Sequence, residues 1–170
     1  MTRMDGGRGS AGARPVGLRP IDRSNRTTVE ELTVRPSQRG FVDGVRESLV
    51  EAEESSALRP WTRAVYAGDV PVGFLMLADD VPSHLTAIPW RYYLWRMLID
   101  HRHQGRGHGR AALDLLCDYL RTRPGADWLY TSVVPGPGSP LGFYRAYGFD
   151  ETGAWFDHEQ VLRLRVRSSP

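Results

Sequence analysis

Apolar side chains recur every three or four residues along several segments of the chain, the spacing that places them on one face of a helix. Four helices are predicted, from Ser24 or Asn25 to about Leu32, from Phe41 to Glu54, from Gly107 to Arg121 and from Ser139 to Tyr147. Gly44 marks a point where the second helix can kink. Gly148 follows the fourth helix in the position where glycine commonly ends helices.

Between the helices, runs rich in β-branched and aromatic residues predict strands. Six strands are predicted, over residues 16–20, 62–66, 70–77, 90–99, 127–133 and 160–166. Ala67-Gly68-Asp69 joins the second and third strands as a hairpin turn, in which glycine supplies the unusual backbone conformation. This order of elements predicts an α/β fold. We expect one mixed central sheet of six to seven strands, flanked by about four helices.

Composition divides the chain of 170 residues into a short tail and one domain. Residues 1–14 are rich in glycine and hold too few apolar groups to offset the entropy of ordering, so we expect a disordered tail. Residues 15–168 form the predicted domain, which has an ordinary size. Cys117 is the only cysteine, so no disulfide forms within the chain. We expect it to pack as a small apolar residue.

Charge and hydropathy argue against two classes of partner. The chain has 22 basic and 20 acidic residues, which are interleaved and leave a formal net charge of +2. Such a pattern has no basic stripe for nucleic acid. No apolar run approaches the roughly 18 residues that cross a bilayer, and the N-terminus lacks the hydrophobic segment of a secretory signal. We therefore expect a cytoplasmic protein with no nucleic-acid or membrane partner.

A glycine-rich loop separates the apolar strand that ends at Asp100 from the long helix that follows. Its residues are Gln104, Gly105, Arg106, Gly107, His108, Gly109 and Arg110. Glycine permits positive φ and close backbone approach, so consecutive N–H groups can turn inward beside the positive end of the helix. This arrangement predicts an anion site that suits a diphosphate, with Gln104 holding the loop and Arg106 and Arg110 adding charge.

Two familiar diphosphate loops do not match this spacing. A Walker A loop requires a lysine, whereas every basic residue of the chain is arginine. A dinucleotide fingerprint requires a third glycine, and the corresponding position is Arg110 or Ala112. The pattern that remains is Gln-x-x-Gly-x-Gly after a strand and at the start of a helix.

This pattern resembles the coenzyme A pyrophosphate loop of the GNAT superfamily of N-acetyltransferases. A second segment, Phe143-Tyr144-Arg145-Ala146-Tyr147-Gly148-Phe149, is similar to the Phe-Tyr-x-x-x-Gly-Phe element of that superfamily. Within the superfamily the chain most resembles the bacterial spermine/spermidine (diamine) acetyltransferases, on residues 41–49, 64–74 and 92–100. The resemblance covers about residues 16–166.

The resemblance implies transfer of an acetyl group from acetyl-CoA to a primary amine by direct attack on the thioester. Backbone groups near Leu98 and Ile99 would meet the pantetheine arm and the thioester, and Ser139 would contact the cofactor or cap its helix. Tyr144 would also contact the cofactor and act as general acid, because a phenol with a pKa near 10 stays protonated at neutral pH. A homodimer is implied as well.

The proton acceptor is less evident, because the central strand carries no glutamate. The nearest acidic groups are Glu51, Glu53, Glu54, Asp79 and Asp80, of which Glu54 and Asp79 are the predicted contacts to a cationic amine. His84, His101, His103 and His108 lie in loops without the carboxylate pattern of a zinc site, so no metal is expected.

Three functional classes remain open. The first is an enzyme that acetylates a small cationic amine, either a polyamine, an amine-bearing antibiotic or a protein N-terminus. The second is a non-catalytic sensor of acyl-CoA. The third is a structural or partner-binding module of α/β fold.

Overall fold

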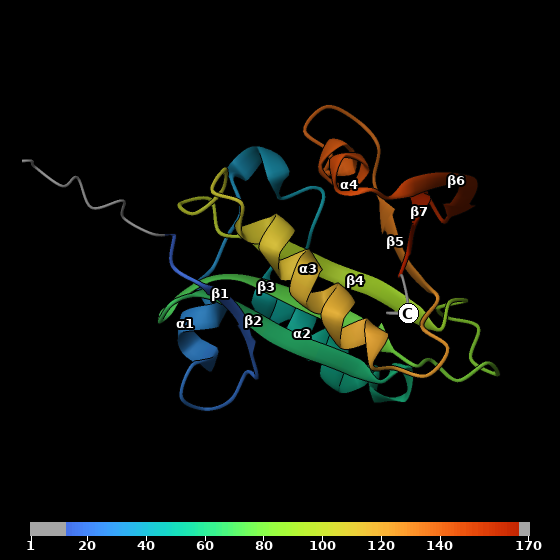
Figure 1. Cartoon of the computed structure of the whole chain (residues 1–170), viewed down its shortest axis with the longest axis horizontal. Helices are drawn as coiled ribbons and strands as arrows, with labels where there is room; N and C mark the ends of the chain where they lie inside the picture. Colours follow the sequence, from blue (N-terminus) through green and yellow to red (C-terminus); the bar gives the residue numbers. More distant parts are fainter. Residues whose placement is uncertain (1–12, 167–170) are drawn as a thin grey trace, which may run out of the picture.

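Seven strands form one mixed sheet in the computed structural model, which describes residues 13–166. The strands are β1 (Val16–Arg19), β2 (Pro60–Ala67), β3 (Val70–Asp79), β4 (Tyr92–Ile99), β5 (Trp128–Val133), β6 (Asp150–Phe156) and β7 (Glu159–Arg165). Their order across the sheet is β1-β2-β3-β4-β5-β7-β6 (Figure 1). Within these residues β4 and β5 form the only parallel pair.

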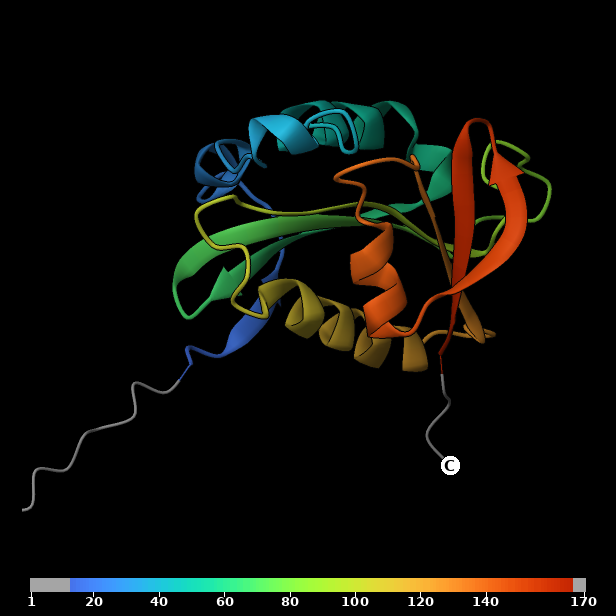
Figure 2. The same ribbon diagram turned by 90° about the horizontal axis from the view of Figure 1, so that it is seen from above.

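Helices cover both faces of the sheet. They are α1 (Arg26–Glu30), α2 (Val45–Glu54), α3 (His108–Arg121) and α4 (Leu141–Tyr147). Figure 2 shows α1 and α2 on one face and α3 on the other. Side chains of β3 alternate between the two layers, as the period of a strand requires. Leu75 and Leu77 pack in the cluster that contains α3, whereas Phe74 and Met76 pack in the cluster that contains α2.

The predicted fold is confirmed, with differences at particular elements. The helix predicted from Phe41 begins at Val45, because Gly44 is extended (φ −65°, ψ 166°) and serves as the N-cap. The helix predicted from Ser139 begins at Leu141. The strand β6 was not predicted, since its sequence is polar and carries Gly153 at a φ of 78°. Antiparallel pairing with β7 holds it in the sheet.

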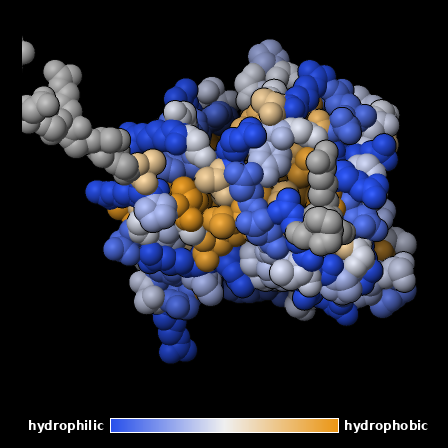
Figure 3. All heavy atoms as spheres, viewed as in Figure 1, coloured by the Kyte–Doolittle hydropathy of each residue, from blue (hydrophilic) through white to orange (hydrophobic). Residues whose placement is uncertain are grey.

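The two ends of the chain lie outside the described residues, and the surface seen in Figure 3 is mostly polar. Residues 1–12 of the predicted tail, and residues 167–170, lie outside the described residues. Hydrophilic residues cover most of the face seen in Figure 3, with apolar residues in small patches between them. Among residues 13–166, every helix is too short or too polar to cross a bilayer.

The sheet forks between β4 and β5. These strands pair only at Tyr93 with Tyr130 and at Leu94 with Thr131, and beyond that point they run apart (Figure 1). The fork coincides with a β-bulge, because the partners of Met76 and Leu77 on β4 are Arg96 and Leu94. Trp95 is therefore an extra residue on β4. The half of β4 that follows it has an open edge toward β5.

Candidate active site

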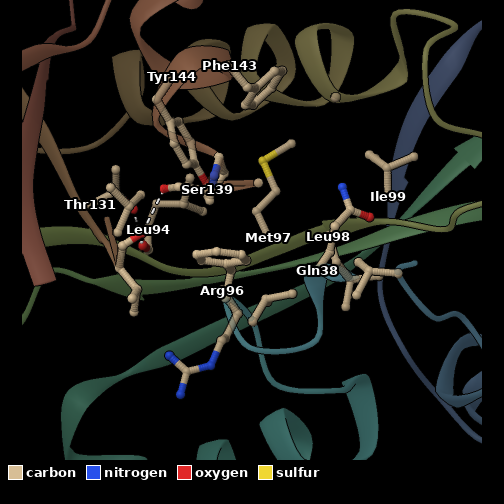
Figure 4. Close-up of a pocket in the computed structure, with 18 of the residues that line it drawn as sticks. Gln38, Leu94, Arg96, Met97, Leu98, Ile99, Thr131, Ser139, Phe143 and Tyr144 are labelled. Atoms are coloured by element: carbon tan, nitrogen blue, oxygen red, sulfur yellow. Dashed lines mark hydrogen bonds between the residues drawn. The ribbon is translucent and has the colours of Figure 1, made fainter. Parts of the chain in front are cut away.

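A cavity of about 720 Å³ occupies the fork. Its walls come from residues 34, 38–43, 94–99, 103–105, 107–110, 131–134, 138–140, 143–144 and 158–159. Figure 4 shows Phe143 and Tyr144 reaching from α4 toward Met97 on one side of β4, and Arg96 pointing the opposite way toward α2. The cavity is therefore lined from both faces of the sheet.

The glycine loop forms one end of this cavity. Gly105 and Gly107 have φ values of 73° and 81°, a conformation that other residues adopt only under strain. Gly107 is the N-cap of α3, whose first turn has neither a side-chain cap nor an acidic residue. The first N–H groups of a helix lack partners within it. The end of α3 therefore presents uncapped donors and positive potential to the cavity, as an anion site requires.

Two side chains fix the chain between the end of β4 and the glycine loop. The Gln104 Nε2 donates hydrogen bonds of 2.9 Å to the Ile99 carbonyl and to the Gln38 Oε1. The buried Asp100 carboxylate accepts bonds from the Arg102 guanidinium (2.7 Å) and from the Thr33 N–H (3.0 Å). Burial opposes ionisation of Asp100, but these hydrogen bonds outweigh it and keep the pKa of that carboxyl well below its usual range.

The open edge of β4 offers backbone donors to the cavity. The Asp100 N–H donates to the Val72 carbonyl of β3 at 2.8 Å, so the preceding carbonyl, that of Ile99, points away from β3. Alternate residues of a strand direct their N–H and C=O groups to the same side. Met97 and Ile99 therefore direct theirs into the fork, where no neighbouring strand pairs with them.

Tyr144 of α4 lines the same cavity as the glycine loop and the open edge of β4. Its side chain is 6% exposed and lines the cavity. Burial raises the pKa of Tyr144, and a hydrogen bond with Thr131 only partly opposes the shift. The phenol therefore stays protonated at neutral and moderately alkaline pH, and it can act as a donor. Tyr147, one turn further on, donates instead to Asp114 of α3 at 2.8 Å.

The other face of the fork is rich in charge. Arg96 donates to Asp43 at 2.8 Å and to Glu51 at 2.9 Å. Burial raises the pKa of Glu51, although Arg96 opposes the shift. Nearby, the Ser132 hydroxyl donates to the Glu159 carboxylate.

Comparison with known proteins shows the family to which the chain belongs. The model of the acetyltransferase (GNAT) family matches residues 41–149, which include the glycine loop and the Tyr144 element. The chain belongs to the acetyltransferase (GNAT) family. It is an N-acetyltransferase, as the resemblance of its two motifs implied.

Named relatives agree with this assignment. The chain is 26% identical over 148 residues to a spermine/spermidine N(1)-acetyltransferase of Bacillus subtilis, which covers 86% of this chain and 96% of the relative. An acetyltransferase structure from Thermus thermophilus superposes with a TM-score of 0.67 at 22% identity, over 89% and 97% of the two chains. A spermidine N-acetyltransferase of Vibrio cholerae, in complex with CoA and spermine, has a TM-score of 0.61 at 17% identity, over 90% and 96%. The two structural likenesses show the shared fold.

Most of the predicted site residues of this acetyltransferase meet at the cavity. Those that line it are Leu98, Ile99, Gln104, Gly105, Gly107, His108, Gly109, Arg110, Ser139 and Tyr144. Ser139 donates to the Val134 carbonyl at 2.7 Å and so closes the loop before α4, whose N-cap is Pro140. Burial, His103 and Arg106 lower the pKa of His108. The loop's charge therefore comes from its arginines.

Three predicted residues do not line the cavity. Arg106 is exposed within the glycine loop, and Glu54 is exposed at the end of α2. Asp79 is buried elsewhere, where it accepts hydrogen bonds from Tyr119 (2.5 Å) and Arg123 (3.1 Å). Among residues 13–166, no group of three His, Cys, Asp or Glu side chains has the arrangement of a metal site.

The sequence did not predict several other residues of the cavity. Gln38, Asp43, Ser132, Phe143 and Glu159 all line the cavity. No motif marks Gln38, Ser132 or Glu159, because their neighbours in space are far away in the sequence. Phe143 lies inside the second motif, but the sequence predicts no role for it. An added Cβ at Gly109 would come within 3.1 Å of the Phe143 ring, so that glycine lets α3 approach α4 closely.

Proposed function

We propose that this acetyltransferase uses acetyl-CoA to acetylate a primary amine of a small cationic acceptor, such as spermidine or spermine, by direct attack on the thioester. The observation that carries the proposal is the cavity through the fork, which has an anion-binding loop at one end and carboxylates at the other. The names of the Bacillus subtilis and Vibrio cholerae relatives favour the polyamine among cationic acceptors.

The glycine loop would hold the diphosphate of the cofactor. Hydrogen bonds to charged groups contribute about 1.5–3 kcal/mol each, and micromolar binding needs about 8 kcal/mol. A few main-chain donors between Gly105 and Arg110 therefore supply much of the affinity. The pantetheine arm would run along the open edge of β4 toward the fork.

The reacting carbonyl would lie beside the Met97 N–H, which faces into the fork. A fixed donor directed at the developing oxyanion typically lowers the barrier by about 2.7–4 kcal/mol. As the C–S bond breaks, the Tyr144 phenol would donate its proton to the departing sulfur. Its raised pKa keeps that proton available over the whole working range of pH.

The acceptor would enter from the α2 face. Asp43 and Glu159 line the cavity there and attract a cationic amine. Asp43 is paired with Arg96, so Glu159 is the stronger attractant for an ammonium group.

The test is release of free thiol from acetyl-CoA by the full chain over a panel of amines. The panel holds spermidine, spermine, putrescine, an aminoglycoside and a peptide with a free N-terminus. We expect turnover with the polyamines at the highest kcat/KM. A higher kcat/KM with the aminoglycoside or the peptide would mean that this compound, and not a polyamine, represents the acceptor. Calorimetric binding of coenzyme A without thiol release would indicate a sensor, and no binding would reject the cofactor site.

A further inference from the structure

We infer that Glu159 accepts the first proton from the acceptor's ammonium group, with Ser132 and Tyr93 positioning its carboxylate. The inference rests on the proposed function, because it concerns the step that makes the amine nucleophilic. An alkylammonium with a pKa near 10.4 is about one part in 10³ neutral at pH 7. Direct attack on the thioester therefore needs a proton acceptor next to the amine.

A chain of hydroxyl groups leads from the sheet to this carboxylate. The Ser132 Oγ–H donates to the Glu159 carboxylate, and the Ser132 Oγ lies 2.6 Å from the Tyr93 Oη. A serine hydroxyl has one hydrogen, so the Tyr93 hydroxyl is the donor in the second bond. Burial raises the pKa of Tyr93 to about 12, with the Ser132 bond opposing. The Tyr93 hydroxyl therefore orients the Ser132 hydroxyl, which donates to Glu159 and keeps its carboxylate in place as an acceptor.

The position of Ser132 relates this carboxylate to the general acid. Thr131 and Ser132 are consecutive on β5, so their side chains point to opposite faces of the sheet. Thr131 bonds Leu94 and contacts Tyr144 on the cofactor face. Ser132 bonds Glu159 on the acceptor face. Tyr144 and Glu159 thus flank the fork from opposite sides, where an acid for sulfur and a base for nitrogen are needed.

The other carboxylates at this face are already paired with a cation. Arg96 bridges Asp43 and Glu51, so its guanidinium occupies one oxygen of each carboxylate, and Glu51 does not line the cavity. Among the residues that the structure describes, no arginine or histidine lies within ion-pair distance of Glu159. Glu159 also lines the cavity directly. Its remaining acceptor capacity faces the bound amine.

The proton and electron balance of the step is complete without another reactant. One N–H proton of the ammonium moves to a Glu159 oxygen and from there to water. The freed lone pair forms the C–N bond to the thioester carbon, and the C–S bond then breaks. The sulfur takes the Tyr144 proton. The second proton lost by nitrogen leaves to solvent, and solvent returns one to Tyr144.

The test compares kcat/KM of the full chain and Glu159→Gln between pH 6.5 and 9.5, with the best amine of the panel. We expect the variant to be about 10²-fold slower at pH 7, since general base catalysis typically contributes 10²–10⁴-fold. The deficit should fall below about tenfold at pH 9.5, where more of the amine is already neutral. Ser132→Ala should show the same dependence on pH with a smaller loss, and Glu159→Asp should recover part of the rate.

Asp157→Asn is the matched control, because it removes the same charge two residues away and does not line the cavity. It should keep the wild-type rate at every pH. If Glu159→Gln equals the wild type, or shows one constant deficit at all pH values, the role of Glu159 is wrong while the proposed function stands. If the wild type releases no thiol with any amine, the proposed function fails and this inference fails with it.

Discussion

The Thr131 hydroxyl donates a hydrogen bond of 2.9 Å to the main-chain carbonyl of Leu94, at the last residue pair that joins β4 to β5. Both residues are buried. The bond therefore holds the apex of the fork, where both residues line the cavity. The same threonine contacts Tyr144, so the point where the sheet opens is joined to the candidate acid.

Thr131→Val should destabilise the protein and disturb catalysis together. Valine keeps the shape but leaves the buried Leu94 carbonyl without this donor, which costs about 1–3 kcal/mol of the free energy of unfolding. Urea denaturation measures the loss, and thiol release measures kcat. Thr62→Val on β2 is the control, because the Thr62 hydroxyl makes no hydrogen bond among the described residues. Equal stability of the two variants would contradict the role of Thr131.

Tyr144→Phe should lower kcat by about 10²–10⁴-fold while the dissociation constant of coenzyme A changes little. The phenol is needed only when the thiolate departs, and the ring that packs in the cavity is retained. Because burial raises the pKa of Tyr144, the wild type should not lose activity through ionisation of this group up to pH 10. Tyr147→Phe, which removes a hydroxyl outside the cavity, should keep the wild-type kcat. Full activity of Tyr144→Phe would contradict the role of Tyr144 as general acid.

Gly107→Val should weaken binding of coenzyme A by about tenfold or more. An added Cβ meets nothing within 4 Å at this position, so crowding is not the cause. The φ of 81° is unfavourable for valine and costs about 1–3 kcal/mol, which the loop avoids by turning its N–H groups away. Calorimetry with coenzyme A measures the effect. Gly17→Val in β1 is the control, since Gly17 has open space and no positive φ. An unchanged affinity of the Gly107 variant for coenzyme A would contradict the prediction that the glycine loop is the anion site.

Asp100→Asn should lower stability at pH 7 by about 1–3 kcal/mol, the range for hydrogen bonds to a charged group. The folded-state pKa of Asp100 is depressed. Its contribution is therefore complete above the unfolded-state value of about 3.9 and is lost as the pH falls from there. Urea denaturation at pH 7, 5 and 3.5 should show a difference between wild type and variant that shrinks only at the lowest pH. A difference that is constant with pH would mean that the Asp100 charge has no part in it.

Local patterns in the sequence predicted most of the helices and strands. The periodicity of residues 107–121 and the alternation around β3 depend on neighbours within one element, so they predicted α3 and the central strands. The hairpin at Gly68 and the end of α4 at Gly148 required particular backbone angles, and both glycines have positive φ. The strand β6 was not predicted because its residues are polar, and only pairing with the strand β7 stabilises it.

The candidate site divides in the same way. By itself the sequence predicted the glycine loop, because its backbone requirements can be read from residue types, and the Tyr144 element, because it is a contiguous motif that resembles that of the superfamily. Only the tertiary structure decided the fork and the acceptor face. Tyr93, Ser132 and Glu159 come from three separate strands, and no local pattern relates them. Their meeting follows from the order and register of β4, β5 and β7 in the sheet, which the packing of the whole chain determines.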